Sequence, residues 1–311
     1  MSSKIALLFA GQGAQAVGMG EDLVSASPAA AALFKQADSQ LGYSLSEIMF
    51  KGPSEELTKT AVCQPALYVH GLACLAALRE RLPDFSFAAA AGLSLGEFTA
   101  HAAAGTFGFA EGLDLVAKRA TAMQDACNET EGGMAAIIGA EENAVRDLAA
   151  AADVDVANLN CPGQIVVSGE KSKVALAVSI AKEYGARKAM ELNVAGAFHS
   201  RLMESAYQRL SAALAETPMN TPAVPVVCNV DARAVSEPDE IRRTLADQVT
   251  GSVRWTESVE YLLDHEKVDL LVEIGPGGVL AGLVNRIRKG APVLSISNLA
   301  TLEEAITKLG A

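Results

Sequence analysis

The sequence lacks an excess of basic residues. Its 25 lysines and arginines are outnumbered by 37 aspartates and glutamates, which gives a formal net charge of −12. A protein that binds nucleic acid needs a basic surface to displace the counterions of the phosphate backbone, so this balance argues against that class. Small anionic ligands remain open, because a local basic patch is enough for them.

The sequence also lacks a cysteine motif. Its five cysteines stand at 63, 74, 127, 161 and 228, an odd number at wide spacings with no CxxC pair. The pattern shows neither a zinc site nor a disulfide framework. It favours reduced thiols in a cytoplasmic protein.

No long apolar run is free of interruption. The run from Ile5 to Ala10 is too short for the core of a signal peptide and indicates a β-strand. The stretch 60–78 contains no Asp, Glu, Lys or Arg, but Gln64, Pro65 and His70 interrupt it. We therefore expect a buried helix there and no association with a membrane.

What the sequence does contain is enough apolar material for a sizeable core. Half of its 311 residues are apolar and 20% are charged, which excludes a disordered chain. At about 150 residues per domain, this length suggests two domains, or one large domain with an insertion.

Most of the chain alternates between apolar strands and helices, and we predict an α/β fold with a mostly parallel sheet. The expected strands of this sheet are 4–10, 87–93, 224–229, 268–274 and 293–296. The expected helices are 28–40, a short one opening at Ser54, 64–81, 95–105, 110–127, 199–216, 239–250, 255–265 and 279–288.

The middle of the chain has a different order. Strands are expected at 134–139, 154–159, 164–168 and 187–194, with helices at 141–152 and 171–184. This βαββαβ order is the split pattern of a ferredoxin-like module. We therefore predict a large domain made of 1–127 and 197–311, with a small ferredoxin-like domain, 128–196, inserted into it.

The clearest local signal is Gly92-Leu93-Ser94-Leu95-Gly96, which follows a predicted strand and precedes a predicted helix. This is the context of a nucleophile elbow, as in hydrolase-like α/β domains, and it makes Ser94 a candidate nucleophile. The glycines let neighbouring backbone pass close, and the N-terminus of the helix can stabilise an oxyanion. The alternative is a tight turn with an inert serine.

A serine nucleophile needs a base, and the chain has four histidines. We expect His70 and His101 to pack inside helices, and His265 to lie in a solvated turn. His199 lies where the predicted insertion returns to the large domain, a favoured place for a site, and is the preferred base.

The α/β-hydrolase order Ser…Asp…His remains an alternative. Ser94, Asp231 or Asp239, and His265 satisfy that order. With His199 as the base, no acid lies obviously between serine and histidine, and a carbonyl oxygen would have to orient the imidazole.

Arg119 is the third unusual residue. It falls at the edge of an apolar stripe on the predicted helix 110–127, beside Met123. A guanidinium there must find an anionic partner or suffer a desolvation penalty. A substrate carboxylate held by two hydrogen bonds and an acid of the protein itself are both open.

Seven motifs in this order give the chain a resemblance, over essentially its whole length, to the malonyl-CoA:acyl carrier protein transacylases of type II fatty-acid synthesis. They are GQGAQ at 11–15, GLSLGE at 92–97, KRATAM at 118–123, NCPGQIVVSG at 160–169, GAFHS at 196–200, the segment from Gln248 through RWTESV at 254–259, and EIGPGGVL at 273–280.

The resemblance implies roles for the catalytic residues. Ser94 would be the nucleophile and His199 the general base, with the carbonyl of Gln248 orienting the histidine in place of an acid. The backbone amides of Gln12 and Leu95 would form the oxyanion hole.

It also implies a substrate pocket. Arg119 would bind the free carboxylate of a malonyl group through two hydrogen bonds, Met123 and Phe198 would shape the acyl pocket, and Asn160 would lie near the site. One position departs from the family, because many members carry His where this chain has Leu93.

The implied reaction transfers malonyl from malonyl-CoA to the phosphopantetheine thiol of acyl carrier protein, through a malonyl-serine ester and with release of coenzyme A. It needs no metal and no cofactor of the protein's own, and we expect a monomer. A serine esterase or thioesterase, and a malonyl-CoA-binding protein without turnover, are the alternatives. Arg286, Arg288, Lys289 or Arg201 are candidates for contacting the acidic carrier protein.

Overall fold

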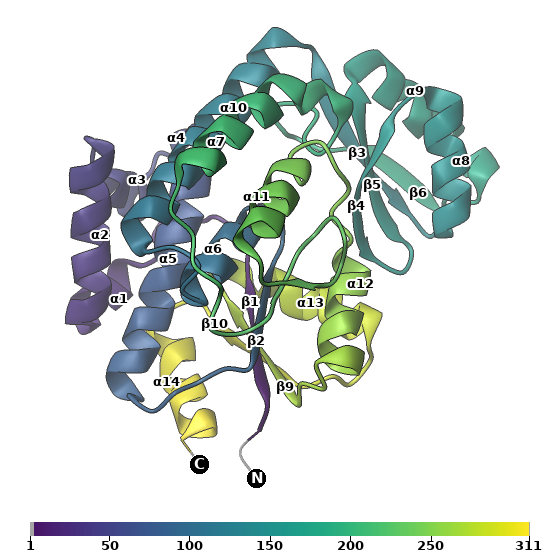
Figure 1. Cartoon of the computed structure of the whole chain (residues 1–311). Coiled ribbons are helices and arrows are strands. Elements are labelled where there is room, and N and C mark those ends of the chain that lie inside the picture. The colour runs from purple at the N-terminus through teal and green to yellow at the C-terminus, as the bar shows by residue number, and fades with distance from the viewer. Residues whose placement is uncertain (1–2, 311) are drawn as a thin grey trace.

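A computed structural model describes residues 3–310 and shows two sheets with helices packed on them (Figure 1). The larger sheet has six strands in the order β10-β9-β1-β2-β7-β8. They are β1 (Ile5–Phe9), β2 (Ala89–Gly92), β7 (Val226–Val227), β8 (Ala234–Val235), β9 (Leu270–Ile274) and β10 (Val293–Ile296). All neighbours are parallel except β7 and β8, so the prediction of a mostly parallel sheet is confirmed.

Helices lie on both faces of this sheet, some packed on its strands and others on neighbouring helices. They are α1 (Glu21–Ala26), α2 (Pro28–Leu41), α3 (Leu45–Lys51), α4 (Ser54–Thr58), α5 (Thr60–Arg81), α6 (Leu95–Ala103), α7 (Phe109–Glu129), α10 (Glu204–Glu216), α11 (Pro238–Asp247), α12 (Trp255–Glu260), α13 (Val279–Ile287) and α14 (Leu299–Leu309). Alternate residues of β1 enter different cores. Leu7 and Phe9 pack in the cluster under α5 and α7, while Ala6 and Leu8 pack with Trp255 under α12 and α13. A strand buried on both faces explains the continuous apolar run.

The long helix α5 lies inside the molecule. It is long and apolar enough to cross a membrane by length and composition, but 89% of its most apolar window is buried in the protein. It packs against α2 and α7. The prediction of a buried core helix is confirmed.

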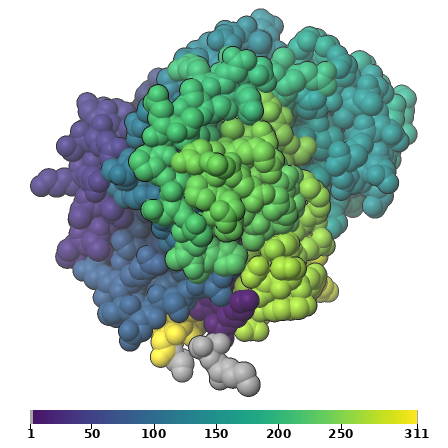
Figure 2. All heavy atoms as spheres, viewed as in Figure 1, coloured from purple at the N-terminus to yellow at the C-terminus, as the bar shows by residue number. Residues whose placement is uncertain are grey.

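The smaller sheet has four antiparallel strands in the order β4-β5-β3-β6, with α8 (Glu142–Ala152) and α9 (Lys171–Ile180) packed on it. Its strands are β3 (Gly132–Ile138), β4 (Asp155–Cys161), β5 (Gln164–Glu170) and β6 (Lys188–Glu191). This is the order of a ferredoxin-like module. It forms a lobe of its own at the upper right of Figure 2. The domain limits 127/128 and 196/197 remain a prediction.

The smaller sheet is attached to the rest of the chain along β4. Leu159 N–H donates to the carbonyl of Val253 at 2.9 Å, and Val253 N–H donates to the carbonyl of Ala157 at 2.8 Å. Val253 lies five positions after Gln248, so this attachment also holds the segment that carries a predicted catalytic residue.

Several elements differ from the sequence prediction. Helices α1, α3 and α14 were not expected, although Asn298 and Thr301 form a capping box at the start of α14. The helix expected from His199 begins as a 3-10 turn at Arg201, because His199 has a φ of 55° and cannot be helical. The strand expected over 224–229 shortens to β7.

Candidate active site

The loops that carry the candidate residues follow the carboxyl ends of parallel strands. Gln12 comes after β1, Ser94 after β2 and Asn229 after β7. Parallel strands end at one edge of a sheet, which is where open α/β sheets bind ligands.

Ser94 occupies a strained turn between β2 and α6. Its φ of 55° and ψ of −108° are unusual for a residue with a side chain. A Cβ at Gly92 would lie 1.9 Å from the carbonyl carbon of Gly96, and a Cβ at Gly96 would lie 2.1 Å from the carbonyl oxygen of Phe9. Backbone therefore packs directly on backbone at the elbow, and only glycine is possible at both positions.

His199 meets Ser94. Its Nε2 lies 2.8 Å from Ser94 Oγ, and its Nδ1 lies 2.8 Å from the backbone oxygen of Gln248. The carbonyl accepts the Nδ1 proton, which leaves the lone pair of Nε2 facing the serine. The predicted contacts of these three residues are thus present.

The other histidines do not reach the elbow. His70 bonds the carbonyl of Ser297, and His101 bonds Thr106, both inside the core. His265 is exposed and stacks on Tyr261. The alternative order that ended in His265 is therefore wrong, because its imidazole lies on the surface.

Burial controls the charge of His199. Desolvation, with the nearby charge of Arg119, lowers the pKa of the imidazole to about 4, and the Gln248 carbonyl opposes this only partly. The ring is neutral near pH 7, as a group that accepts a proton must be.

Arg119 is buried with its guanidinium aimed at the serine. One Nη donates to Gln64 Oε1 at 2.6 Å, and the other donates to Gln248 Oε1 at 2.8 Å and to Ser94 Oγ at 3.1 Å. The ring of Phe98 lies 5.4 Å from its central carbon. Burial lowers its pKa to about 10, so it stays a cation.

Within residues 3–310 no carboxylate lies within ion-pair distance of Arg119, and its hydrogen-bond partners are two amide oxygens and a hydroxyl. Glu97 is the acid near enough for its charge to act on the guanidinium. The alternative that an acid of the protein occupies it is wrong. One of its Nη atoms donates to Ser94 Oγ.

The remaining predicted residues lie around this centre. Met123 Sδ accepts from Gln64 Nε2 at 3.5 Å, and Phe198 packs in the same buried cluster. Neither Leu95 N–H nor Gln12 N–H donates to another group in the described part of the chain, so both stay available. Their role at an oxyanion remains a prediction.

Three residues of the site were missed by the sequence analysis. Gln64 Oε1 accepts a hydrogen bond from Arg119, and Asn229 Oδ1 accepts one from Ser94 N–H at 2.7 Å. Glu97 is buried and accepts hydrogen bonds from Asn229 and Gln248. The available signals were Gln64 and Glu97, two polar residues within largely apolar stretches of α5 and α6.

A family model described as acyl transferase domain matches residues 6–301. The chain belongs to this acyl transferase family.

A malonyl CoA-acyl carrier protein transacylase of Bacillus subtilis (strain 168) is 42% identical, and the match covers 99% of this chain and 98% of that protein. Solved structures of such transacylases share the fold of this chain. The malonyl CoA-acyl carrier protein transacylase of Coxiella burnetii has a TM-score of 0.95 and 35% identity, and covers 100% of this chain and 99% of its own.

A third relative was solved with a partner. It is a malonyl-transacylase in complex with a type II PKS acyl-carrier protein, with a TM-score of 0.93 and 36% identity, covering 98% of this chain and 100% of its own. The fold of the present chain is that of this acyl transferase family.

Proposed function

We propose that this protein transfers a malonyl group from malonyl-CoA to the phosphopantetheine thiol of acyl carrier protein, for fatty-acid synthesis. The observation that carries the proposal is Arg119, a buried cation whose hydrogen bonds in residues 3–310 go to no carboxylate and whose Nη lies 3.1 Å from Ser94 Oγ. An esterase for simple acyl groups has no use for a buried cation there. The names of the relatives support the same substrate and acceptor.

The first half-reaction loads the enzyme. His199 Nε2 takes the proton of Ser94 as Oγ attacks the thioester carbonyl, and the oxyanion accepts hydrogen bonds from the N–H groups of Gln12 and Leu95. The C–S bond then breaks, and His199 returns the proton to the coenzyme A thiolate. A malonyl-Ser94 ester remains.

The second half-reaction unloads it. His199 deprotonates the phosphopantetheine thiol, the thiolate attacks the ester carbonyl, and the proton passes to Ser94 Oγ as the C–O bond breaks. Both half-reactions use one site, so the kinetics are ping-pong. Neither step needs a metal or a prosthetic group of the enzyme.

Arg119 selects the acyl group. A malonyl carboxylate can take two hydrogen bonds from the guanidinium, with Met123 and Phe198 as the walls of the acyl pocket. An acetyl group leaves the buried cation without its partner, and it should load poorly.

We further propose a monomer in the cytoplasm. All groups of the site come from one chain. All five cysteines are free and buried, which fits a reducing compartment.

The test is the intact mass of the protein after brief incubation with malonyl-CoA or acetyl-CoA, with Ser94→Ala as the control. We expect one malonyl adduct that is absent from the control and weak with acetyl-CoA. Release of coenzyme A without an adduct would point to a hydrolase. Neither adduct nor release would leave a binding protein.

Arg119→Ala extends the same experiment. It should slow malonyl loading on the order of 100-fold, since removing one partner of a buried charge pair costs roughly 3 kcal/mol or more. Acetyl loading should fall much less, because an acetyl group has no carboxylate that loses its partner. An equal loss with both substrates would contradict the role in selection.

A further inference from the structure

Glu97 is a buried acid that the transfer steps above do not use. It lies in the first turn of α6, three residues after Ser94, and its exposed fraction is 0%. Burial raises its pKa to about 8. A carboxyl group in such a place lowers stability unless its contacts repay the desolvation.

One oxygen of Glu97 carries all of its hydrogen bonds. Oε2 accepts from the backbone N–H of Asn229 at 3.0 Å and from Nε2 of Gln248 at 2.6 Å. Oε1 has no partner within residues 3–310. The carboxyl group thus joins two segments that are far apart in the sequence.

The first segment clamps the nucleophile. The Asn229 side chain accepts from Ser94 N–H at 2.7 Å and donates to the carbonyl of Gly92 at 2.8 Å. Both sides of the strained turn are held by this one amide. Because Glu97 fixes the backbone of Asn229, it fixes the clamp.

The second segment holds the base and the cation. Gln248 Nε2 also donates to the carbonyl of Ser94 at 3.0 Å. With Nε2 directed at two acceptors, Oε1 of Gln248 must face Arg119, and the backbone oxygen of Gln248 bonds His199. The side-chain amide of Gln248 therefore positions Arg119, while its backbone oxygen positions His199.

We propose that Glu97 is a positioning residue, whose Oε2 locks the Ser94 elbow to the Gln248 segment. This inference rests on the proposed function. Without this acceptor, the Gln248 amide keeps only its bonds to the Ser94 carbonyl and Arg119, and the link from the Gln248 segment to the backbone of Asn229 is lost. Glu97 touches no reacting atom and acts only through these neighbours.

Glu273 on β9 is a matched comparison. Its exposed fraction is also 0%, and it accepts from Leu280 N–H, Ala281 N–H and the hydroxyl of Ser295. These bonds fix the start of α13 and reach none of the candidate catalytic groups. Loss of the Glu273 carboxylate should therefore lower the stability of the fold and leave malonyl loading unchanged.

The experiment compares Glu97→Gln, Glu97→Met and Glu273→Met by the single-turnover rate of malonyl loading, its KM and the melting temperature. Glutamine can keep both hydrogen bonds through its oxygen, so we expect loading within about tenfold of the unaltered enzyme. Methionine fills the space without a strong acceptor. It should slow the loading step roughly 100-fold, since displacement of reacting groups by about 1 Å has that effect.

Glu273→Met should lower the melting temperature and leave the loading rate of the folded protein unchanged. Loading by Glu97→Met within about threefold of the unaltered enzyme, or failure of Glu97→Gln to rescue the rate, would overturn the proposal. If the unaltered enzyme forms no adduct at all, the proposed function fails instead.

A second pair covers the case in which Glu97→Met does not fold. Gln248→Met removes the same hydrogen bond from the other side and keeps the backbone carbonyl. We expect it to slow loading, while Glu97→Gln alone does not. Loading by folded Gln248→Met at the rate of the unaltered enzyme would overturn the proposal.

Discussion

At the scale of single residues, the serine oxygen is the meeting point of the site. Ser94 Oγ lies within hydrogen-bond distance of a neutral imidazole and of a guanidinium. The imidazole can remove a proton, and the cation favours the charge that develops on oxygen as it does so. Both groups are buried, so water screens neither effect.

The pH dependence of loading follows from His199. Only the neutral imidazole can take the serine proton, and its pKa is lowered from about 6.5 to about 4. As pH falls, kcat/KM for malonyl-CoA should hold through pH 6 and decline only near pH 4. A half-fall near pH 6.5 would contradict this.

The control for that profile is the folded fraction at each pH, from circular dichroism. Between pH 6.5 and 4 the unfolded chain binds more protons at His199 than the folded one, so this residue lowers stability as pH falls. Glu97, whose pKa is raised to about 8, acts in the opposite direction, since its folded form holds the extra proton.

The sequence was sufficient for Ser94, His199, Gln248 and Arg119, because motifs and the resemblance pointed to each of them. It was not sufficient for the residues that hold them. Asn229 reaches Ser94 across 135 positions, and Gln248 reaches Glu97 across 151. No local pattern encodes a contact that only the folded chain creates.

At the scale of elements, the elbow is a crossing of two backbones. β2 runs beside β1, and the first turn of α6 lies on the end of β1 with no side chain between them. Such a crossing tolerates no added atoms, in contrast to ordinary helix packing.

Gly96→Ala and Gly282→Ala form a pair that tests this. The first adds a methyl group 2.1 Å from the Phe9 carbonyl oxygen and should cost several kcal/mol, on the order of 3 or more. The second lies in α13 with nothing within 4 Å and should stabilise the protein by about 0.5–1 kcal/mol. Thermal or denaturant unfolding measures both, and similar changes for the two would contradict the close crossing.

Long periodic elements were predictable, and short ones were not. Ser27 caps α2 at Pro28 as its residue types predict, and α5 and α7 lie within a few residues of their expected limits. α14 was missed although Leu302, Ala305 and Ile306 face the core at helical spacing. β7 keeps two residues because the chain turns away at Cys228 to place Asn229.

At the scale of the whole molecule, the net negative charge constrains where an acidic carrier protein can dock. The net charge is −12 and the proposed carrier protein is acidic, so docking must depend on local cations. Arg201 is held by Asp153 and Asp155, and Arg288 by Asp264. Of the four candidates, Arg286 and Lys289 form no ion pair in residues 3–310.

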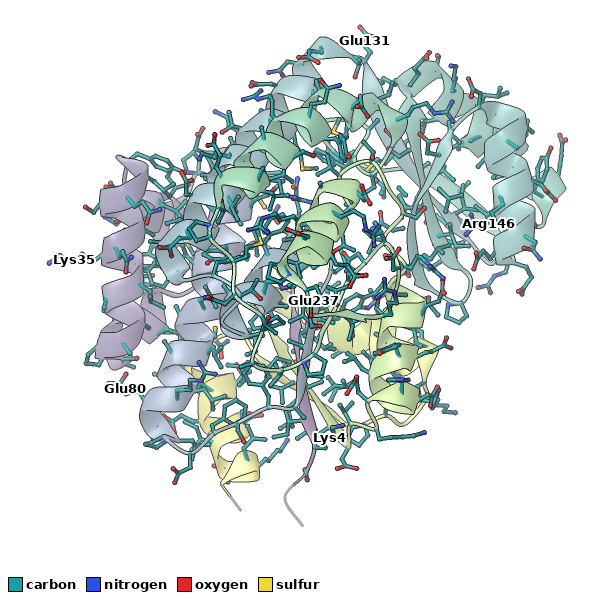
Figure 3. All side chains as sticks on the ribbon, in the orientation of Figure 1. Lys4, Lys35, Glu80, Glu131, Arg146 and Glu237 are labelled. Carbon is teal, nitrogen blue, oxygen red and sulfur yellow. The ribbon has the colours of Figure 1, made fainter. Side chains whose placement is uncertain are left out.

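Arg286→Glu/Lys289→Glu should therefore raise the KM for the carrier protein by on the order of tenfold, and the effect should shrink at high salt. Loading from malonyl-CoA should be unchanged. Lys35→Glu/Lys308→Glu makes the same change in charge on α2 and α14; Lys35 projects away from the molecule at the left edge of Figure 3. Equal effects of the two double variants in the steady-state assay would rule out a local docking contact.

The bond between β4 and Val253 has a consequence for solubility. An unpaired outer strand is a template on which other chains can add, and proteins cover or shorten such strands. In the small sheet, one edge strand is β4, whose backbone bonds Val253. The other edge strand is β6, which is four residues long and has Lys188 and Glu191 at its ends. While the chain is folding, β4 lacks its cover until the C-terminal third arrives. A stalled or truncated chain should therefore self-associate through β4, and the finished protein should not.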